Sequence, residues 1–132
     1  MALRPAGMVV DCAEVMRVAT FWADALGWVL DDDSGPNGAF ISDGGDEDGG
    51  IYFQPVPEPK VAKNRWHMDV RPTGAMAEEV ERLTGLGATV RGFIEVEDNF
   101  WTQMRDPEGN EFCILRGPGD GLEGSGMAGV SR

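Results

Sequence analysis

Two well-separated stretches of this sequence carry side chains that could take part in acid-base, nucleophilic or metal chemistry. His67 is the only histidine and stands in the alternating stretch 65–70, whereas Glu111 and Cys113 stand in residues 111–115, directly after the acidic turn 106–110. An imidazole can act as general base, hydrogen-bond donor or metal ligand, and a thiolate as nucleophile or metal ligand. If both stretches are strands, they can place these side chains in one pocket. His67 is therefore the candidate catalytic residue, and the open question is whether a metal is bound.

The first half of the chain has a hydrophobic pattern typical of a β-α-β-β-β unit. Residues 7–12 form a short apolar run, and residues 14–26 carry apolar side chains at helical spacing up to Gly27. Three further strands are expected at 28–31, 38–42 and 50–54, separated by turn-rich segments. The unit therefore covers roughly residues 7–56.

The second half repeats this order after a proline-rich connector at 55–63. The pattern predicts a strand over 65–70, a helix over 73–86 that ends at Gly87, and strands over 88–93, 99–104 and 111–115. On the alternating strand, we expect His67 to share a face with Arg65 and Asp69, and Trp66 to point toward the helix. Residues 10–27 also parallel residues 68–87, which indicates an internal duplication with a second module at about 64–116.

Composition limits the class of protein. A chain of 132 residues fits one domain, here expected over residues 1–116, followed by a Gly-rich disordered tail at 117–132. The net charge of -12 opposes binding to nucleic acid or anionic membranes and mildly favours cationic ligands. Two cysteines without a C-x-x-C pair, and no signal peptide or spanning segment, predict a cytoplasmic protein.

Two motifs resemble the vicinal oxygen chelate superfamily, which includes glyoxalase I, extradiol dioxygenases, fosfomycin-resistance enzymes and bleomycin-binding proteins. They are Phe-Trp-Ala-Asp-Ala-Leu-Gly-Trp at 21–28 and Asp-Pro-Glu-Gly-Asn at 106–110, within two β-α-β-β-β modules. The resemblance covers roughly residues 7–116. It implies an α+β fold in which two βαβββ modules form a glyoxalase-like open β-barrel cleft.

The resemblance also implies where a metal would bind, because metal-using members take ligands from the first, fourth, fifth and eighth strands. Those positions fall on Gly7, Gln54, His67 and Cys113. Only His67 is an orthodox ligand among them. Glu111 does not replace the usual glutamate, since two residues along a strand displace a side chain by about 6.6 Å. We therefore expect no metal or other cofactor, with a divalent metal held by unorthodox ligands as the alternative.

The predicted ligand pocket combines polar and aromatic side chains from both modules. Purely structural roles are the alternative for two of these residues. A lone histidine on a strand is often structural, and a cysteine between Phe112 and Ile114 often behaves as a small buried hydrophobe. The residues expected to line the pocket are Gln54, Arg65, His67, Trp101, Glu111 and Cys113.

These observations give two functional hypotheses. The first is a glyoxalase/bleomycin-resistance-like protein that binds a small molecule in a cleft without the usual divalent metal site. The alternative is a divergent lyase or isomerase that uses His67 with or without a metal, or His67 and Cys113 directly. Modules of this superfamily pair within one chain or across a dimer, and we expect a homodimer.

Overall fold

The computed structural model describes residues 1–45 and 48–121 of the chain. It divides into two compact units, Met1–Lys60 and Val61–Arg132, each of which is described separately. The division falls within the proline-rich connector. In the described residues, each unit contains one α-helix and one four-stranded mixed sheet, so the predicted α+β class is confirmed. The closure of the two sheets into an open β-barrel cleft stays a prediction.

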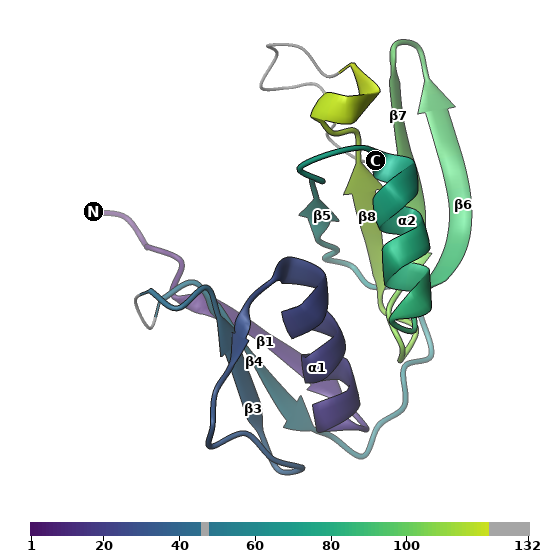
Figure 1. The fold of residues 1–132 in the computed structure, drawn as a ribbon. Coiled ribbons are helices and arrows are strands. Elements are labelled where there is room, and N and C mark those ends of the chain that lie inside the picture. The colour runs from purple at the N-terminus through teal and green to yellow at the C-terminus, as the bar shows by residue number, and fades with distance from the viewer. Residues whose placement is uncertain (46–47, 122–132) are drawn as a thin grey trace. The chain divides into compact units, whose positions relative to one another are not determined.

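The N-terminal unit follows the predicted element order, with boundaries that differ by at most one residue at each end. Its elements are β1 (Gly7–Cys12), α1 (Val15–Leu26), β2 (Val29–Leu30), β3 (Ala39–Ser42) and β4 (Gly50–Pro55). The strand order is β1-β4-β3-β2, with β1 and β4 parallel and the other pairs antiparallel. Gly27 ends α1, as predicted. The helix packs on the sheet through side chains that are buried at helical spacing, among them Val15, Val18 and Trp22 (Figure 1).

The C-terminal unit repeats this arrangement. Its elements are β5 (Asp69–Val70), α2 (Met76–Gly85), β6 (Thr89–Val96), β7 (Asn99–Arg105), β8 (Glu111–Leu115) and the short 3-10 helix η1 (Pro118–Asp120). The order β5-β8-β7-β6 matches that of the first sheet, and the first and last strands are again parallel. The sequence therefore correctly predicted two modules of like topology.

The two faces of the C-terminal sheet carry different side chains. On one face, Thr102 contacts Met76 of α2, its hydroxyl lying 3.5 Å from the sulfur, so this face packs on the helix. Alternation along β8 places Cys113 and Leu115 on the opposite face. We call that side the Cys113 face; strand register adds Asp69, opposite Cys113, and Trp101, opposite Leu115.

The structure corrects two predicted element boundaries in this unit. The strand expected over residues 65–70 is limited to Asp69–Val70, and Arg65 and Trp66 lie in a bend. Trp66 is exposed rather than directed toward the helix, because alternation does not apply outside the strand. The helix expected from Thr73 begins at Met76.

The start of α2 depends on a residue far away in sequence. The Asp120 carboxylate accepts hydrogen bonds from the backbone N–H groups of Met76, at 2.7 Å, and Gly117, at 2.9 Å. The disordered tail predicted from Gly117 is therefore wrong for residues 117–121, which carry η1 and this cap. The rest of that predicted tail, 122–132, lies outside the described residues.

The remaining global features concern the cysteines, helix lengths and surface charge. Cys12 and Cys113 are both buried and form no disulfide in the described part of the chain. Within residues 1–45 and 48–121, no helix has the length and apolar character needed to cross a bilayer.

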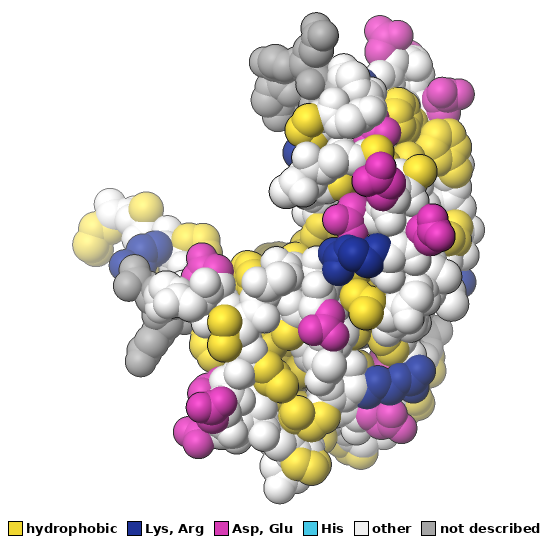
Figure 2. Space-filling view, viewed as in Figure 1, with side chains coloured by type: hydrophobic (Ala, Val, Ile, Leu, Met, Phe, Trp, Pro, Cys, Tyr) yellow, Lys and Arg dark blue, Asp and Glu magenta, His cyan; other side chains and the backbone are white. Residues whose placement is uncertain are grey.

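Acidic side chains are spread over both units on the surface shown in Figure 2. The negative charge is therefore not concentrated at one place on that surface.

Candidate functional site

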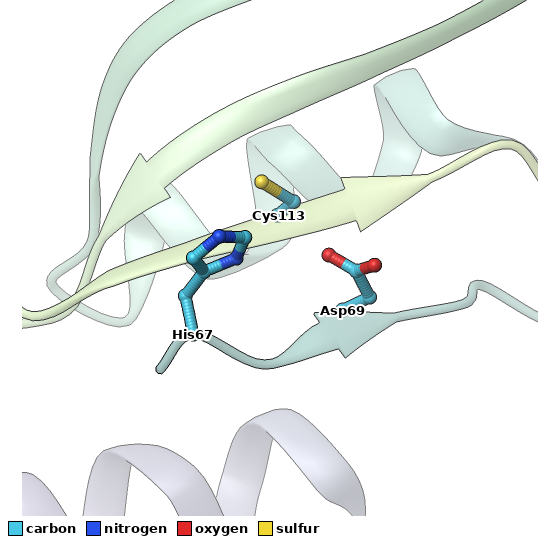
Figure 3. Close-up of side chains that lie close together, drawn as sticks. All are labelled: His67, Asp69 and Cys113. Carbon is cyan, nitrogen blue, oxygen red and sulfur yellow. The ribbon is translucent and has the colours of Figure 1, made fainter. Parts of the chain in front are cut away.

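Three chemically active side chains converge in the C-terminal unit. One potential ligand atom from each of His67, Asp69 and Cys113 lies within 4.8 Å of the other two. Figure 3 shows the imidazole, carboxylate and thiol beside one another above β5 and β8. We call these three residues the His67 cluster.

Strand pairing explains why these residues meet. Asp69 on β5 is the register partner of Cys113 on β8, and side chains of directly paired residues point to the same face. The Cys113 N–H also donates a 2.9 Å hydrogen bond to the Met68 carbonyl, which holds the start of β5 against β8. His67 lies two residues before Asp69, just outside β5, and its imidazole lies beside the Asp69 carboxylate and the Cys113 thiol (Figure 3). The cluster therefore requires only the C-terminal unit.

The members of the cluster differ in their exposure to solvent. Cys113 is 4% exposed and packs with Trp101 and Leu115, whereas Asp69 is exposed. His67 is half-buried, and its Nδ1 atom is buried without a hydrogen-bond partner in the described part of the chain. A buried imidazole nitrogen normally has a hydrogen-bond partner or a metal. The cluster thus places an unsatisfied nitrogen beside a carboxylate and a thiol.

Two further predicted pocket residues occupy positions around this cluster. Glu111 is half-buried, and its Oε1 accepts a 3.0 Å hydrogen bond from the Asn64 N–H. This hydrogen bond joins Asn64, directly after the connector, to the start of β8. Arg65 is exposed in the bend before β5. Neither residue belongs to the group of possible metal ligands formed by the His67 cluster.

Trp101 is the aromatic residue that the sequence predicted for the ligand pocket. It is in the middle of β7, is 1% exposed and packs with Cys113 and Leu115. Its ring therefore belongs to the apolar cluster on the Cys113 face, and its contact with a ligand stays a prediction. The indole Nε1 has no hydrogen-bond partner among the described residues.

The N-terminal unit carries the other two superfamily ligand positions, and neither offers a ready donor. The Gln54 side chain is exposed and its amide donates a 2.9 Å hydrogen bond to the Asp11 carboxylate. Gly7 has no side chain, and an added Cβ would lie 2.9 Å from the Gly50 carbonyl oxygen. A ligand side chain at Gly7 would therefore force the two parallel strands apart.

The resemblance to metal-using proteins implies a divalent metal, and the donor atoms described above can be compared with what such a metal requires. The four-position set does not fit, because Gly7 has no donor and Gln54 bonds to Asp11. The His67 cluster fits better: three protein donors with one position open is the usual composition of a catalytic zinc site. Its thiol and imidazole suit zinc rather than magnesium, which prefers oxygen ligands.

A protein-family comparison identifies the chain. The family described as "Glyoxalase-like domain" matches residues 7–115, which include both modules and the His67 cluster. The chain belongs to the glyoxalase-like domain family. It is thus a member of the vicinal oxygen chelate superfamily, as the sequence motifs indicated. No curated protein matches this glyoxalase-like chain.

Solved structures with the same fold are distant in sequence. A point mutant of the fosfomycin resistance protein FosX from Listeria monocytogenes, complexed with Mn(II) and 1S,2S-dihydroxypropylphosphonic acid, has a TM-score of 0.70 at 14% identity, covering 89% of this chain and 92% of that one. The bleomycin-binding protein from Streptomyces verticillus, complexed with copper(II)-bleomycin, has 0.58 at 18%, covering 89% and 98%. A glyoxalase-related enzyme from Fulvimarina pelagi has 0.66 at 15%, covering 98% and 96%. At these identities the similarity establishes the fold alone.

Sequence reasoning missed one member of the site in this glyoxalase-like chain. Asp69 was expected on the face of His67, but it was not considered as a ligand because it is not one of the four superfamily positions. The missing information was the register of β5 against β8, which makes Asp69 the partner of Cys113. Alternation from His67 was the only sequence signal for it.

Proposed function

We propose that this glyoxalase-like protein binds a small organic molecule on the Cys113 face, without the four-position metal set of its superfamily. The observation that supports this is the convergence of imidazole, carboxylate and thiol on one sheet face. Small-molecule sites typically combine apolar lining with a few convergent polar groups. Trp101 and Leu115, which pack with Cys113, would supply the apolar part of the site, and His67 and Asp69 the polar part.

The charges at this face suggest the ligand's chemistry. Asp69 is exposed and offers a carboxylate to a cationic or hydrogen-bond-donating group, and the net charge of -12 favours cations at longer range. His67 offers either a donor or an acceptor, according to its tautomer. We therefore expect cationic or neutral hydrogen-bonding molecules to bind more tightly than anions of similar size.

The experiment is a thermal-shift panel on chelator-treated protein, followed by calorimetric titration of each compound that binds. The panel contains bleomycin as the cationic probe, fosfomycin as the anionic probe and neutral compounds of similar size. We expect cationic compounds to raise Tm most, and Asp69→Asn to weaken them by roughly tenfold, as expected for one lost charge-assisted contact. Val9→Ala, on the matching face of the N-terminal sheet, is the control. Binding that survives Asp69→Asn and His67→Ala unchanged would place the site elsewhere.

A second candidate function is proton transfer of the lyase or isomerase type. It is favoured by one observation, the unpartnered imidazole nitrogen of His67 within a cluster that also holds a carboxylate. His67 would act as general base, and Asp69 would orient the ring and stabilise its protonated form. In the alternative with a metal, His67, Asp69 and Cys113 would be its ligands, so His67 would not be the base; the metal would supply Lewis-acid stabilisation of the charge that develops on the substrate.

This enzymatic candidate can be tested with compounds from the panel that bind. Each is incubated with the protein in deuterium oxide, and exchange of its carbon-bound hydrogen is followed by NMR. His67→Ala should slow exchange by about 100-fold or more, within the range of general-base catalysis. Exchange at the wild-type rate in this variant would exclude His67 as the base.

The homodimer expected from the sequence is a separate proposal. One chain has a mass of 14.2 kDa, so a dimer would have 2 × 14.2 = 28.4 kDa. Light scattering coupled to size-exclusion chromatography measures this mass directly. A single peak at the mass of one chain would contradict it.

A further inference from the structure

Asp69 gives the C-terminal unit a third potential metal ligand that the superfamily pattern does not include. It is the register partner of Cys113, and both lie near His67. Two of the four superfamily positions, Gly7 and Gln54, belong to the N-terminal unit and offer no ready donor there. All three members of the His67 cluster instead belong to one unit.

The spacing of the cluster is compatible with one small ion. Zinc lies about 2.0 Å from nitrogen or oxygen ligands and about 2.3 Å from sulfur, so tetrahedral donors are roughly 3.3 to 3.6 Å apart. The donor atoms of the cluster are already within 4.8 Å of one another. Rotations that move side-chain ends by about 1 Å are therefore enough to reach tetrahedral spacing. Burial does not prevent such a movement at Asp69, because its side chain is exposed.

The surroundings of the cluster favour a defined site over an adventitious one. Cys113 packs with Trp101 and Leu115 on the same sheet face, and its backbone N–H donates a hydrogen bond to the Met68 carbonyl. His67 Nδ1 is a buried nitrogen that lacks a partner in the described part of the chain. A metal ion between the three side chains would either coordinate this buried imidazole nitrogen directly or bind the other ring nitrogen and thereby fix the tautomer.

The donor types select the class of metal. Thiolate and imidazole are ligands of zinc and other late transition metals, while magnesium and calcium require mostly oxygen donors. Three protein ligands leave one position of a tetrahedral ion open for water or for an oxygen of a bound molecule. We infer that His67, Asp69 and Cys113 together bind one zinc ion within the C-terminal unit and leave one coordination position open.

This zinc site occupies the same sheet face as the small-molecule site proposed above, but it does not require an organic ligand. The two proposals are therefore tested separately. The organic panel uses chelator-treated protein, and the zinc test contains no organic compound. Failure of one leaves the other standing.

The test is calorimetric titration of chelator-treated full-length protein with zinc chloride, with magnesium chloride as the hard-metal comparison. We expect one zinc per chain and no comparable binding of magnesium. Cys113→Ser should weaken zinc binding by more than about 100-fold, beyond the loss expected for an outer-shell partner, and Asp69→Asn by about tenfold or more. Cobalt(II) substitution provides a second readout, because a thiolate ligand gives an intense charge-transfer band that Cys113→Ser should remove.

Matched controls separate ligation from folding. Cys12→Ser removes the other buried thiol, and Asp11→Asn changes the aspartate that faces the last strand of the N-terminal unit. Both should leave zinc affinity within about twofold of wild type. Asp69→Asn is the decisive variant if Cys113→Ser unfolds, since an exposed side chain tolerates substitution. Less than one zinc per chain, equal binding of magnesium, or equal losses in Cys12→Ser and Cys113→Ser would each overturn the inference.

Discussion

The two units have the same strand order but differ at corresponding positions. In each, the first strand runs parallel to the last, and an aspartate faces that last strand: Asp11 opposite Gln54, and Asp69 opposite Cys113. In the N-terminal unit this pair is closed by a 2.9 Å side-chain hydrogen bond. In the C-terminal unit the pair stands beside His67, whereas the residue two positions before Asp11 is Val9.

This difference shows how a duplicated fold divides structure and chemistry. Strand register determines which positions are neighbours, and the side chains at those positions determine which interactions they can form. Val9 is 58% exposed and has no polar atom on its side chain, whereas His67 is half-buried with an unpartnered nitrogen among the described residues. Cys113 is 4% exposed on an apolar base. The potential ligand atoms of the His67 cluster therefore all belong to the C-terminal unit, whereas the N-terminal unit joins Asp11 and Gln54 at the corresponding positions by a hydrogen bond.

The largest expected effect concerns the turns that lead into the last strand of each unit. The Asp106 carboxylate is buried and accepts hydrogen bonds from the Glu108 N–H at 2.9 Å and from the Asn110 N–H and side-chain amide, both at 3.0 Å. Gly109 completes this turn with φ 89°. Asp106→Ala would leave these donors unpaired and should lower the free energy of unfolding by about 3 kcal/mol. Urea denaturation measures the loss.

The matching turn of the N-terminal unit gives the control. Asp43 is exposed and, among the described residues, accepts one hydrogen bond, from the Gly45 N–H at 2.9 Å. Asp43→Ala should therefore cost less than about 0.5 kcal/mol. Equal losses in the two variants would show that the turns contribute alike, and would contradict this asymmetry between the units. Asp106→Asn should fall between Asp106→Ala and wild type, because an amide oxygen still accepts part of the network.

The sequence predicted the features that are local and periodic. Apolar spacing correctly indicated both helices and the repeated strand order, and residues 106–110 were correctly expected to form a turn. What it missed depends on contacts between distant residues. Asp69 joins the site through the register of β5 with β8, and Trp101 is buried by packing against Leu115 and Cys113. No local pattern contains either contact.

The start of α2 is another feature that could not be predicted locally. Neither helix has a side-chain cap from its own N-cap residue, Glu14 or Ala75, but α2 is capped by Asp120 from η1. Asp120→Ala should lower the free energy of unfolding by about 1 kcal/mol, the usual effect of losing an N-cap. Differential scanning calorimetry should show a decrease in Tm of roughly 4 °C. Glu14→Ala should leave Tm nearly unchanged, and a similar decrease in both variants would contradict a specific role for Asp120.

The smallest effect distinguishes the surfaces of the two helices. In α2, Glu79 and Arg82 form a contact of 2.6 Å three residues apart, while the corresponding spacing at the start of α1 places Arg17 and Glu14 at 3.7 Å. Exposed pairs of this kind contribute only a few tenths of a kcal/mol and are weakened by salt. Glu79→Gln should therefore lower the free energy of unfolding by about 0.3 kcal/mol at low salt and by less at high salt. Glu14→Gln should have a smaller effect, because a 3.7 Å contact between two exposed side chains contributes little. A larger salt-dependent loss there would show that α1, too, depends on its surface charges.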